Sequence, residues 1–405
     1  MDFEDTAEEK AFREEARAWL EANVPTEEEM TGMDGMQRAK HWQKKKADAG
    51  WACIRWPEEY GGRGASAIQN VILGQEEARV GGPETGVFSI GQGMAAPTMM
   101  TWANDEDKKK YLPRLASGED IWCQLFSEPA GGSDLAALRT KAERDGDDWV
   151  INGQKIWTSG AHYSDYGILV VRTDPNVPKH KGLSYFFLDM KSPGIEIKPI
   201  KQISGEANFN EVYFTDVRIP DSQRLGELGQ GWQVSLTTLM NERASIGAGG
   251  GGTKFGTVKK LAETVMLNGK PAIEDANVRA KLASWYVEEN GLKYTSYRTL
   301  SALSRGEIPG PENSIGKLVG GRKQQDMASF AIDLLQQQGI VRDRDLEREF
   351  SSLFTDTYMS IPGLRIAGGT DEIMANIIAE RVLGLPQEPR LDKGIPFTEV
   401  PTGAN

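Results

Sequence analysis

The chain has 405 residues, with 47 Lys and Arg against 59 Asp and Glu, and so carries a formal charge of −12. Apolar residues make up 39% and charged residues 26%, which excludes a disordered chain and allows roughly two to three globular domains. The acidic balance also argues against nucleic acid as a partner, because DNA and RNA binding depends on clustered Lys and Arg.

The first 120 residues carry helical signals. Apolar residues recur at helical spacing in the stretch Phe12–Leu20, among Glu and Arg. The same spacing predicts further helices near residues 37–50, 68–80 and 105–116. The glycine-rich stretch Trp56–Gly64 predicts a loop. We therefore expect an N-terminal helical domain over residues 1–120.

Strand and turn signals replace the helical pattern between residues 121 and 228. Short runs rich in β-branched and aromatic residues predict strands over 166–172, 183–190, 195–200 and 211–217. Asp145-Gly146 and Asn152-Gly153 are turn dipeptides of the kind that connects hairpins. No helix-length pattern separates the runs, so the sheet should be mostly antiparallel. The sequence predicts an antiparallel β-barrel or β-sandwich domain over residues 121–228.

Helical patterns return after Pro220 and continue to residue 390. Helical spacing puts Leu236, Leu239, Met240 and Arg243 on one helix face. The same spacing applies to Val278, Leu282, Trp285 and Tyr286. A last helix should begin at Thr370, whose hydroxyl suits an N-cap, and end at Gly384. The predicted fold is therefore α+β, with a C-terminal helical domain over residues 229–390 and a tail over 391–405.

The two cysteines, Cys53 and Cys123, could form at most one disulfide, too few to stabilise a chain of this length. This favours a reducing compartment. The first residues lack the pattern of a secretory signal, and no apolar run approaches the ~20 residues that span a bilayer. We expect a cytoplasmic protein that has no membrane partner. His41, His162 and His180 are far apart and neither cysteine has a CxxC partner, so no metal site and no Ser-His-Asp hydrolase is expected.

The run Gly247–Gly252 formally matches the G-x-G-x-x-G pattern of dinucleotide-binding proteins. That pattern needs a preceding strand, whereas residues 232–246 have helical periodicity. The glycines are better explained by the close approach of a helix to a ligand or to another backbone.

Three separate segments carry residues suited to binding an anionic or heteroaromatic ligand. Cys123–Asp134 places a Gly-rich, hydroxyl-bearing loop after a strand, and Asn152–Gly160 places a tryptophan beside two hydroxyls. Ile366–Ile373 places two glycines before a helix N-terminus. Taken one at a time, the segments are more simply explained as a turn, a hairpin and a helix cap.

Taken together and in order, the segments resemble the acyl-CoA dehydrogenase family over nearly the whole chain. The resemblance rests on L-F-S-E-P-A-G-G-S-D, N-G-Q-K-I-W-T-S, G-G-T-D-E-I and A-E-R-V-L-G-L-P. It implies a helical N-terminal domain, a middle β domain and a C-terminal four-helix bundle, with FAD as cofactor for α,β-dehydrogenation of an acyl-CoA thioester. Trp56–Gly62 and Arg381–Pro386 are similar to bacterial members that degrade steroid side chains and rings. This second resemblance implies a role in lipid or steroid catabolism.

The resemblance also implies roles for residues by their position. Residues at the flavin ring or its edge would be Phe126, Ser127, Trp157, Thr158 and Ser159. Gly132 and Ser133 would approach FAD and the pantetheine arm of the substrate, and Arg243 would also contact the substrate. Thr370 and Glu372 would face the FAD pyrophosphate and ribose from a helix N-terminus.

The resemblance implies an unusual position for the catalytic base. Many family members carry it as Glu in a Tyr-Glu-Gly-Thr segment, where this chain has Gly368. A minority carry it as Glu-Arg on the first long helix after the β domain, where this chain has Glu242-Arg243. Glu242 would then remove the α-proton, and the Gly368 N–H would donate to the thioester carbonyl. A wider pocket at Gly368 would suit a branched or polycyclic acyl group. Alternatively, Glu242 is an ordinary surface glutamate paired with a nearby cation.

Oligomeric state and electron acceptor are also expectations from the family. Common family members reach the FAD of a neighbouring subunit through two segments, Arg-x-Phe-Gly and Gln-x-x-Gly-Gly. This chain has no full match to either segment, and Gln336–Gly339 matches the second in part. We expect a homotetramer, or a heterotetramer with an unlike acyl-CoA dehydrogenase chain, that passes electrons to an electron-transfer flavoprotein. Two alternatives stay open: an oxidase or monooxygenase on the same fold, and a non-catalytic subunit that completes a partner's FAD site.

Overall fold

The computed structural model describes residues 5–248, 253–304, 310–342, 350 and 352–401. The side chains of residues 243–248, 300, 303 and 304 lie outside the description, and so does most of the run Gly247–Gly252. The chain divides into two compact units. The first consists of Met1–Lys201, Ala207–Glu242 and Pro389–Asn405, and the second of Gln202–Glu206 and Arg243–Glu388.

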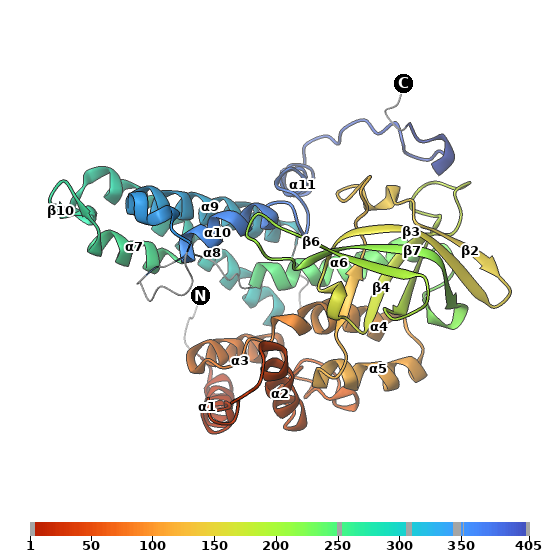
Figure 1. Cartoon of the computed structure of the whole chain (residues 1–405), viewed down its shortest axis with the longest axis horizontal. Coiled ribbons are helices and arrows are strands. Elements are labelled where there is room, and N and C mark those ends of the chain that lie inside the picture. The colour runs from red at the N-terminus through yellow and green to blue at the C-terminus, as the bar shows by residue number, and fades with distance from the viewer. Residues whose placement is uncertain (1–4, 249–252, 305–309, 343–349, 351, 402–405) are drawn as a thin grey trace. The chain divides into compact units, whose positions relative to one another are not determined.

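Helices occupy the N-terminal part of the first unit, as predicted. They are α1 (Ala7–Asn23), α2 (Gly35–Asp48), α3 (Ala67–Val80), α4 (Ala96–Trp102) and α5 (Asp105–Ser117). Capping boxes at Thr6, Asp34 and Ser66 fix where α1, α2 and α3 begin. The apolar stripe of α1 is buried against Trp42 and Trp51, which explains why α1, α2 and α3 lie together in Figure 1.

The middle of the chain forms one eight-stranded sheet in the first unit. Its strands are β1 (Trp122–Leu125), β2 (Lys141–Asp145), β3 (Asp148–Ser159), β4 (Tyr166–Arg172), β5 (Leu183–Asp189), β6 (Ile195–Ile200), β7 (Phe209–Pro220) and β8 (Arg224–Leu225). Their order is β6-β7-β3-β2-β4-β5-β8, with β1 paired to β4. Pairing is antiparallel except for β1 with β4 and one residue pair of β2 with β4. The predicted antiparallel character and the hairpin at Asp145-Gly146 are therefore confirmed.

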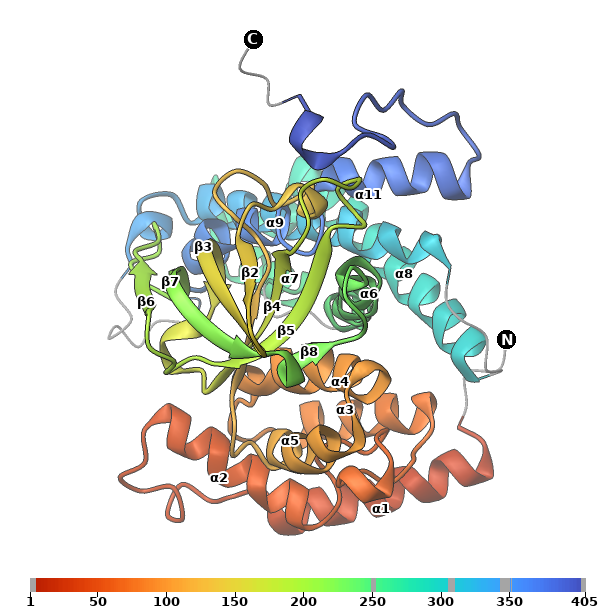
Figure 2. The same ribbon diagram turned by 90° about the vertical axis from the view of Figure 1, so that its right-hand side faces the viewer.

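Strands β4 and β5 are buried on both faces, which explains their continuously apolar sequences. Alternate residues join different cores. Val170 and Tyr185 pack in the core shared with α4 and α5, which lie beneath the sheet in Figure 2. Val171 and Phe186 pack in the core on the other face, with residues of β3 and β7. The sheet is therefore a rigid platform for the loops at its ends.

The dipeptide Asn152-Gly153 is not a hairpin turn, so that prediction is wrong. It forms a bulge inside β3, where pairing with β7 shifts register between Ile151 and Gly153. Gly153 has a φ of +153°, and a Cβ there would come within 2.5 Å of Thr140 Oγ1. The Asn152 side chain donates to Asp216 Oδ1 and accepts from the Asp216 N–H, so it stabilises the strand pair instead of a turn.

Helix α6 (Gly231–Ala248) buries a different face in the first unit from the one predicted. Leu236 and Met240 are exposed, whereas Thr238 is fully buried. The Thr238 hydroxyl lies 2.8 Å from the hydroxyl of Tyr185 on β5. A buried hydroxyl without a partner is costly, so this pairing outweighs the apolar spacing in setting which face of the helix is inside.

Across its described residues, the second unit is helical, with one short hairpin. Its elements are α7 (Phe255–Thr264), β9 (Met266–Leu267), β10 (Lys270–Pro271), α8 (Ala276–Ser304), α9 (Ser314–Leu335), α10 (Leu353–Leu364) and α11 (Asp371–Ile377). Helices α7 to α10 share an apolar core that includes Val278, Leu282 and Trp285, as predicted. Tyr286, predicted on the same face, is 56% exposed, because consecutive residues point about 100° apart around a helix.

Candidate functional site

The predicted flavin loop follows β1 and is fastened to β3. Phe126 is buried, and its carbonyl accepts a hydrogen bond from Lys155 Nζ at 3.1 Å. The Ser127 carbonyl accepts from the Ile156 N–H at 2.9 Å. Because Lys155 and Ile156 lead directly into Trp157, the structure brings two of the predicted segments together.

Gly132 and Ser133 lie at the exposed end of this loop. A Cβ at Gly132 would lie 3.7 Å from the Ser127 hydroxyl, which is an ordinary contact. Packing within the chain therefore does not require a glycine there. A backbone without a side chain at this position allows close approach of a ligand, as the resemblance implies.

A buried ion pair that was not predicted from the sequence holds the loop. Lys155 is fully buried, and its Nζ lies 2.8 Å from Glu128 Oε1. Glu128 also accepts from two backbone N–H groups, at 2.6 and 2.9 Å. Although burial alone would raise it, the ammonium of Lys155 holds the pKa of Glu128 below its ordinary value. The alternation that buries Trp149 and Ile151 also points Lys155 inward, which is the signal that could have revealed the pair.

A second bulge in β3 exposes the tryptophan that the resemblance places on the flavin ring. Pairing with β7 shifts register between Lys155 and Thr158, and Trp157 between them has a φ of +59°. A left-handed backbone at a bulky residue stores about 1–3 kcal/mol of strain and is typical of functional positions. The indole is 56% exposed and meets the Phe209 ring edge-on, with the ring centroids 6.2 Å apart. A broad aromatic face is thus available to a ligand.

Thr158 has a buried hydroxyl for which the described part of the chain offers no hydrogen-bond partner. Its carbonyl, in contrast, accepts from Asn210 Nδ2 at 2.9 Å. An orphaned hydroxyl costs about 1–3 kcal/mol, and this one follows directly after Trp157. Ser159, the last residue of β3, is half-buried. The residues present therefore fit a flavin, whose ring would cover the indole and whose edge would offer the hydroxyl a partner.

Glu242 lies on α6 beside the strand that leads into the flavin loop. Gln124 on β1 donates from Nε2 to Glu242 Oε2 at 3.3 Å. Glu242 is half-buried, and its charge adds to burial in raising the pKa of the Tyr185 hydroxyl. The structure thus links Glu242 to β1 at Gln124, two residues before Phe126. Gln124 was not predicted as a site residue, and its strand neighbours are both fully buried.

In the second unit, Gly368 and Thr370 form a tight entry into α11. Gly368 and Gly369 have φ values of +64° and +95°, which glycine adopts without strain. Thr370 accepts a hydrogen bond from a backbone N–H three residues on, at 3.2 Å, so the predicted N-cap is confirmed. The helical conformation continues as a π-helical turn, Ile378–Val382, and ends close to the predicted Gly384.

Two carboxylates lie at this helix N-terminus. Asp371 is buried and pairs with Arg365 at 2.6 Å and Arg322 at 3.1 Å. Although burial works against it, these guanidinium groups hold the pKa of Asp371 below its ordinary value. Glu372 is exposed, and hydrogen bonds from its own backbone and from Thr370 lower its pKa. An ionised Glu372 suits ribose hydroxyls, which can donate to it, better than it suits a pyrophosphate.

Other features of the chain have a simpler reading. The side chain of Arg243 lies outside the described residues, so its predicted contact with the substrate stays a prediction. Cys53 and Cys123 are buried free thiols. Across the described ranges, no cluster of His, Cys, Asp and Glu side chains could hold a metal ion. In the same ranges, every helix is too short or too polar to cross a membrane.

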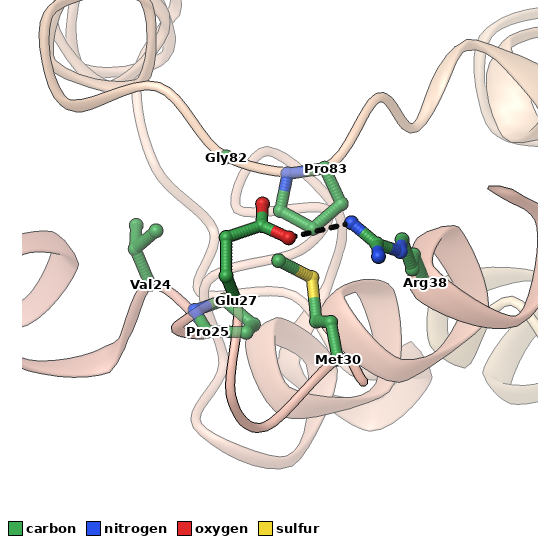
Figure 3. A pocket seen from close by; sticks show the side chains of 7 residues that line it. All are labelled: Val24, Pro25, Glu27, Met30, Arg38, Gly82 and Pro83. Carbon is green, nitrogen blue, oxygen red and sulfur yellow. Dashed lines mark hydrogen bonds and ion pairs between the residues drawn. The ribbon is translucent and has the colours of Figure 1, made fainter. Parts of the chain in front are cut away.

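A separate pocket lies among the N-terminal helices (Figure 3). Its lining residues are Val24, Pro25, Glu27, Met30, Arg38, Gly82 and Pro83. Glu27 and Arg38 face each other there in an ion pair of 3.0 Å. The pair neutralises the charge of the pocket, and the lining includes none of the predicted site residues.

Three family models match successive parts of the chain. The acyl-CoA dehydrogenase N-terminal domain matches residues 6–119, the middle domain 123–217 and the C-terminal domain 229–383. Among curated proteins, the chain is 35% identical over 386 residues to acyl-CoA dehydrogenase IpdE1 of Mycobacterium tuberculosis (strain ATCC 25618 / H37Rv). That match covers 93% of this chain and 98% of the relative.

Two solved structures are similar over almost the full length. The Tcur3481-Tcur3483 steroid ACAD has a TM-score of 0.79 and 30% sequence identity, covering 96% of this chain and 100% of the relative. The ChsE4-ChsE5 complex from Mycobacterium tuberculosis has a TM-score of 0.78 and 29% identity, with the same coverage. The predicted order of helical, β and helical domains is the family's order, and family members are FAD-dependent enzymes. The chain belongs to the acyl-CoA dehydrogenase family.

Proposed function

We propose that this chain catalyses the α,β-dehydrogenation of an acyl-CoA thioester, with Glu242 as the base that removes the α-proton. The observation that carries the proposal is the position of Glu242, half-buried and hydrogen-bonded to Gln124 just before the flavin loop. Gly368 stands where many family members carry the base, so the catalytic carboxylate has to stand at another position.

Each residue has one task in this proposal. Trp157 would pack on the flavin ring, and the Thr158 hydroxyl would hydrogen-bond to its edge. Glu242 receives the α-proton on its carboxylate. The Gly368 N–H donates to the thioester carbonyl and stabilises the negative charge that develops on its oxygen. FAD, when bound, supplies the acceptor for the β-hydride.

We further propose a branched or polycyclic acyl group as the substrate class. Glycine at position 368 occupies less space than the glutamate of many family members. The relative named a steroid ACAD supports a steroid-type acyl group. Titration of the purified flavoprotein with straight-chain, branched and steroid acyl-CoA thioesters tests the proposal, with loss of the visible flavin absorbance as the signal. Bleaching by straight-chain thioesters alone would show that the substrate class is wrong.

The proposed assembly is a homotetramer or a heterotetramer with an unlike chain, and the proposed electron acceptor is an electron-transfer flavoprotein. A relative described as a complex of two chains, ChsE4 and ChsE5, supports a heteromeric assembly. Reoxidation of the substrate-reduced enzyme by electron-transfer flavoprotein, compared with reoxidation by air, tests the acceptor. Faster reoxidation by air would favour an oxidase.

The variant Glu242→Gln tests the base directly. Gln keeps the shape and the hydrogen-bonding capacity but cannot take the proton, so flavin reduction should slow by about 10²-fold or more while FAD stays bound. The matched control is Glu227→Gln, which changes an exposed glutamate just before α6 and should reduce flavin at the wild-type rate. A wild-type rate of flavin reduction in Glu242→Gln would show that Glu242 is not the base.

A non-catalytic subunit is the second candidate, favoured by the two-chain composition of the ChsE4-ChsE5 relative. In that case the chain alone should not reduce flavin and an unlike chain should be needed to complete the FAD site. Co-expression with such a chain separates the two candidates. If Glu242→Gln leaves the rate of the complex unchanged, the base belongs to the other chain.

A further inference from the structure

The C-terminal segment Pro389–Val400 docks on the β domain of the first unit, although it has no task in the proposed chemistry. The Phe397 N–H donates to the Val177 carbonyl at 3.0 Å, and the Thr398 N–H donates to the Pro175 carbonyl at 3.2 Å. The stretch immediately before it is exposed throughout. We name Pro389–Val400 the C-terminal strap.

One buried lysine connects the strap with the loop that carries Ser133. Lys179 has a side chain that is only 3% exposed, and it pairs with Asp134 at 2.6 Å. It also pairs with Asp392 of the strap. The hydrogen bond from Lys179 lowers the pKa of Asp392 to about 2, so this pair is ionised at neutral pH. Because Asp134 directly follows Ser133, the strap reaches the loop through a single ammonium group.

A second buried cation connects the strap with the far end of the same loop. The guanidinium carbon of Arg172 lies 3.5 Å from the centroid of the Phe397 ring, and Arg172 is 4% exposed. Its nitrogens donate to the carbonyls of Ala136 and Leu138 at 2.6 and 3.1 Å. Burial lowers the pKa of Arg172 to about 10. An aromatic face is a favourable partner for such a desolvated cation. Phe397 therefore stabilises Arg172, whose hydrogen bonds hold this end of the loop.

We propose that the C-terminal strap positions the Ser133–Leu138 loop, with Asp392 and Phe397 as positioning residues that act through Lys179 and Arg172. The inference rests on the proposed function and on the expectation from the family resemblance that Ser133 approaches FAD and the pantetheine arm. The two connections hold opposite ends of the loop. Without the strap, both buried cations lose a partner and the loop loses its support at both ends.

Hydrogen–deuterium exchange of the full-length protein without added FAD tests the positioning. The variants Asp392→Asn and Phe397→Ala are compared with the control Leu391→Ala, whose side chain is 85% exposed on the same strap. Backbone amides of residues 137–140, which are hydrogen-bonded within the loop or to Glu128, should exchange about tenfold faster in both strap variants. The control should match the wild type.

Unchanged exchange at residues 137–140 in both strap variants overturns the proposal. If Phe397→Ala accelerates exchange throughout the first unit, its loss of packing has loosened the fold, and Asp392→Asn decides alone. That variant keeps the volume of the side chain and removes only its charge. Faster exchange in 137–140 with wild-type exchange in α1 to α3 supports the strap.

Kinetics of the FAD-loaded enzyme separate positioning from a merely structural role. Asp392→Asn should raise KM for the acyl-CoA about tenfold and change kcat by less than about twofold, because it loosens substrate binding and leaves the base in place. Asp392→Glu, which restores the charge, should recover most of the wild-type KM. A lower melting temperature with unchanged KM overturns the proposal. If the wild type shows no flavin reduction at all, the proposed function fails, while the exchange experiment still decides on the strap.

Discussion

Gln124 is the residue that links the proposed base to the flavin loop. Its neighbours Cys123 and Leu125 are fully buried in the core that includes residues of β3 and β7. The Gln124 side chain therefore points to the opposite face of the sheet, toward α6. There its amide donates to Glu242 at 3.3 Å. A donor beside a carboxylate favours the ionised form, which is the form that can accept a proton.

Removal of this donor should slow the reaction. In Gln124→Leu the carboxylate of Glu242 loses the amide that holds it in place. Flavin reduction should therefore slow by about tenfold while FAD stays bound, and stopped-flow measurement of flavin bleaching checks it.

The control for this prediction is Gln154→Leu. Gln154 also donates to a glutamate, Glu211, at 3.3 Å, on the same sheet but away from α6. Gln154→Leu should reduce flavin at the wild-type rate. An equal rate in Gln124→Leu and the wild type would contradict the link between Gln124 and the base.

At the scale of elements, a buried carboxylate joins α1 to α3. Glu76 on α3 is 3% exposed and accepts hydrogen bonds from Arg17 at 2.9 Å and Arg13 at 3.2 Å, both on α1. It also accepts from Arg79 at 2.8 Å. The hydrogen bonds from Arg17, together with those from Arg79 and Arg13, lower the pKa of Glu76 to about 2 in spite of burial.

A pKa lowered on folding stabilises the protein above the pKa of the unfolded chain and ceases to do so as the pH falls to the folded value. Glu76→Gln should therefore lower the free energy of unfolding by about 1–3 kcal/mol at neutral pH. The difference from the wild type should shrink between about pH 4.5 and pH 2. Urea unfolding at a series of pH values measures it.

The matched control is Glu21→Gln, which removes an exposed partner of the same Arg79, paired at 2.6 Å. Exposed ion pairs are worth about 0–1 kcal/mol, so this change should be small at every pH. A difference between Glu76→Gln and the wild type that persists unchanged below pH 2 would show that the carboxylate charge is not the cause.

At the scale of the whole molecule, helix α8 carries apolar side chains that the second unit does not bury. Trp285 is in the core, but Tyr286, Val287 and Tyr294 are 56%, 68% and 48% exposed. Exposed aromatic and aliphatic residues gathered on one helix are typical of association surfaces. They support the proposed tetramer, in which other subunits would cover them.

Light scattering of the purified protein should give a mass near four times the 44.6 kDa of one chain if it is a homotetramer. With a co-expressed unlike chain, it should give the summed mass of two copies of each chain. Val287→Lys would bury a charge in the interface and should lower the mass. Val287→Ile keeps the surface apolar and should leave the mass unchanged. A monomeric mass of the wild type under both conditions would contradict the tetramer.

The sequence by itself determined those features that depend on neighbouring residues. Capping residues such as Thr6, Ser66 and Thr370 start helices through bonds to a backbone three positions away. The turn Asp145-Gly146 joins two strands by local backbone preference. The family is recognisable for the same reason, because its motifs are short contiguous strings read in order. The main helices, the strands β4 to β7 and family membership were therefore accessible before the structure, whereas the full length of β3 was not.

Only the tertiary structure decided how these elements use their side chains. The inward face of α6 depends on Thr238 meeting Thr98, 140 residues away, and Gln124 meets Glu242 across 118 residues. Asn152-Gly153 has the composition of a turn, but pairing with β7 holds it in a strand. Local propensities are worth less than about 1 kcal/mol per residue, and a buried hydroxyl or carboxylate that lacks its partner costs more. Long-range pairing therefore outweighs local preference at these positions.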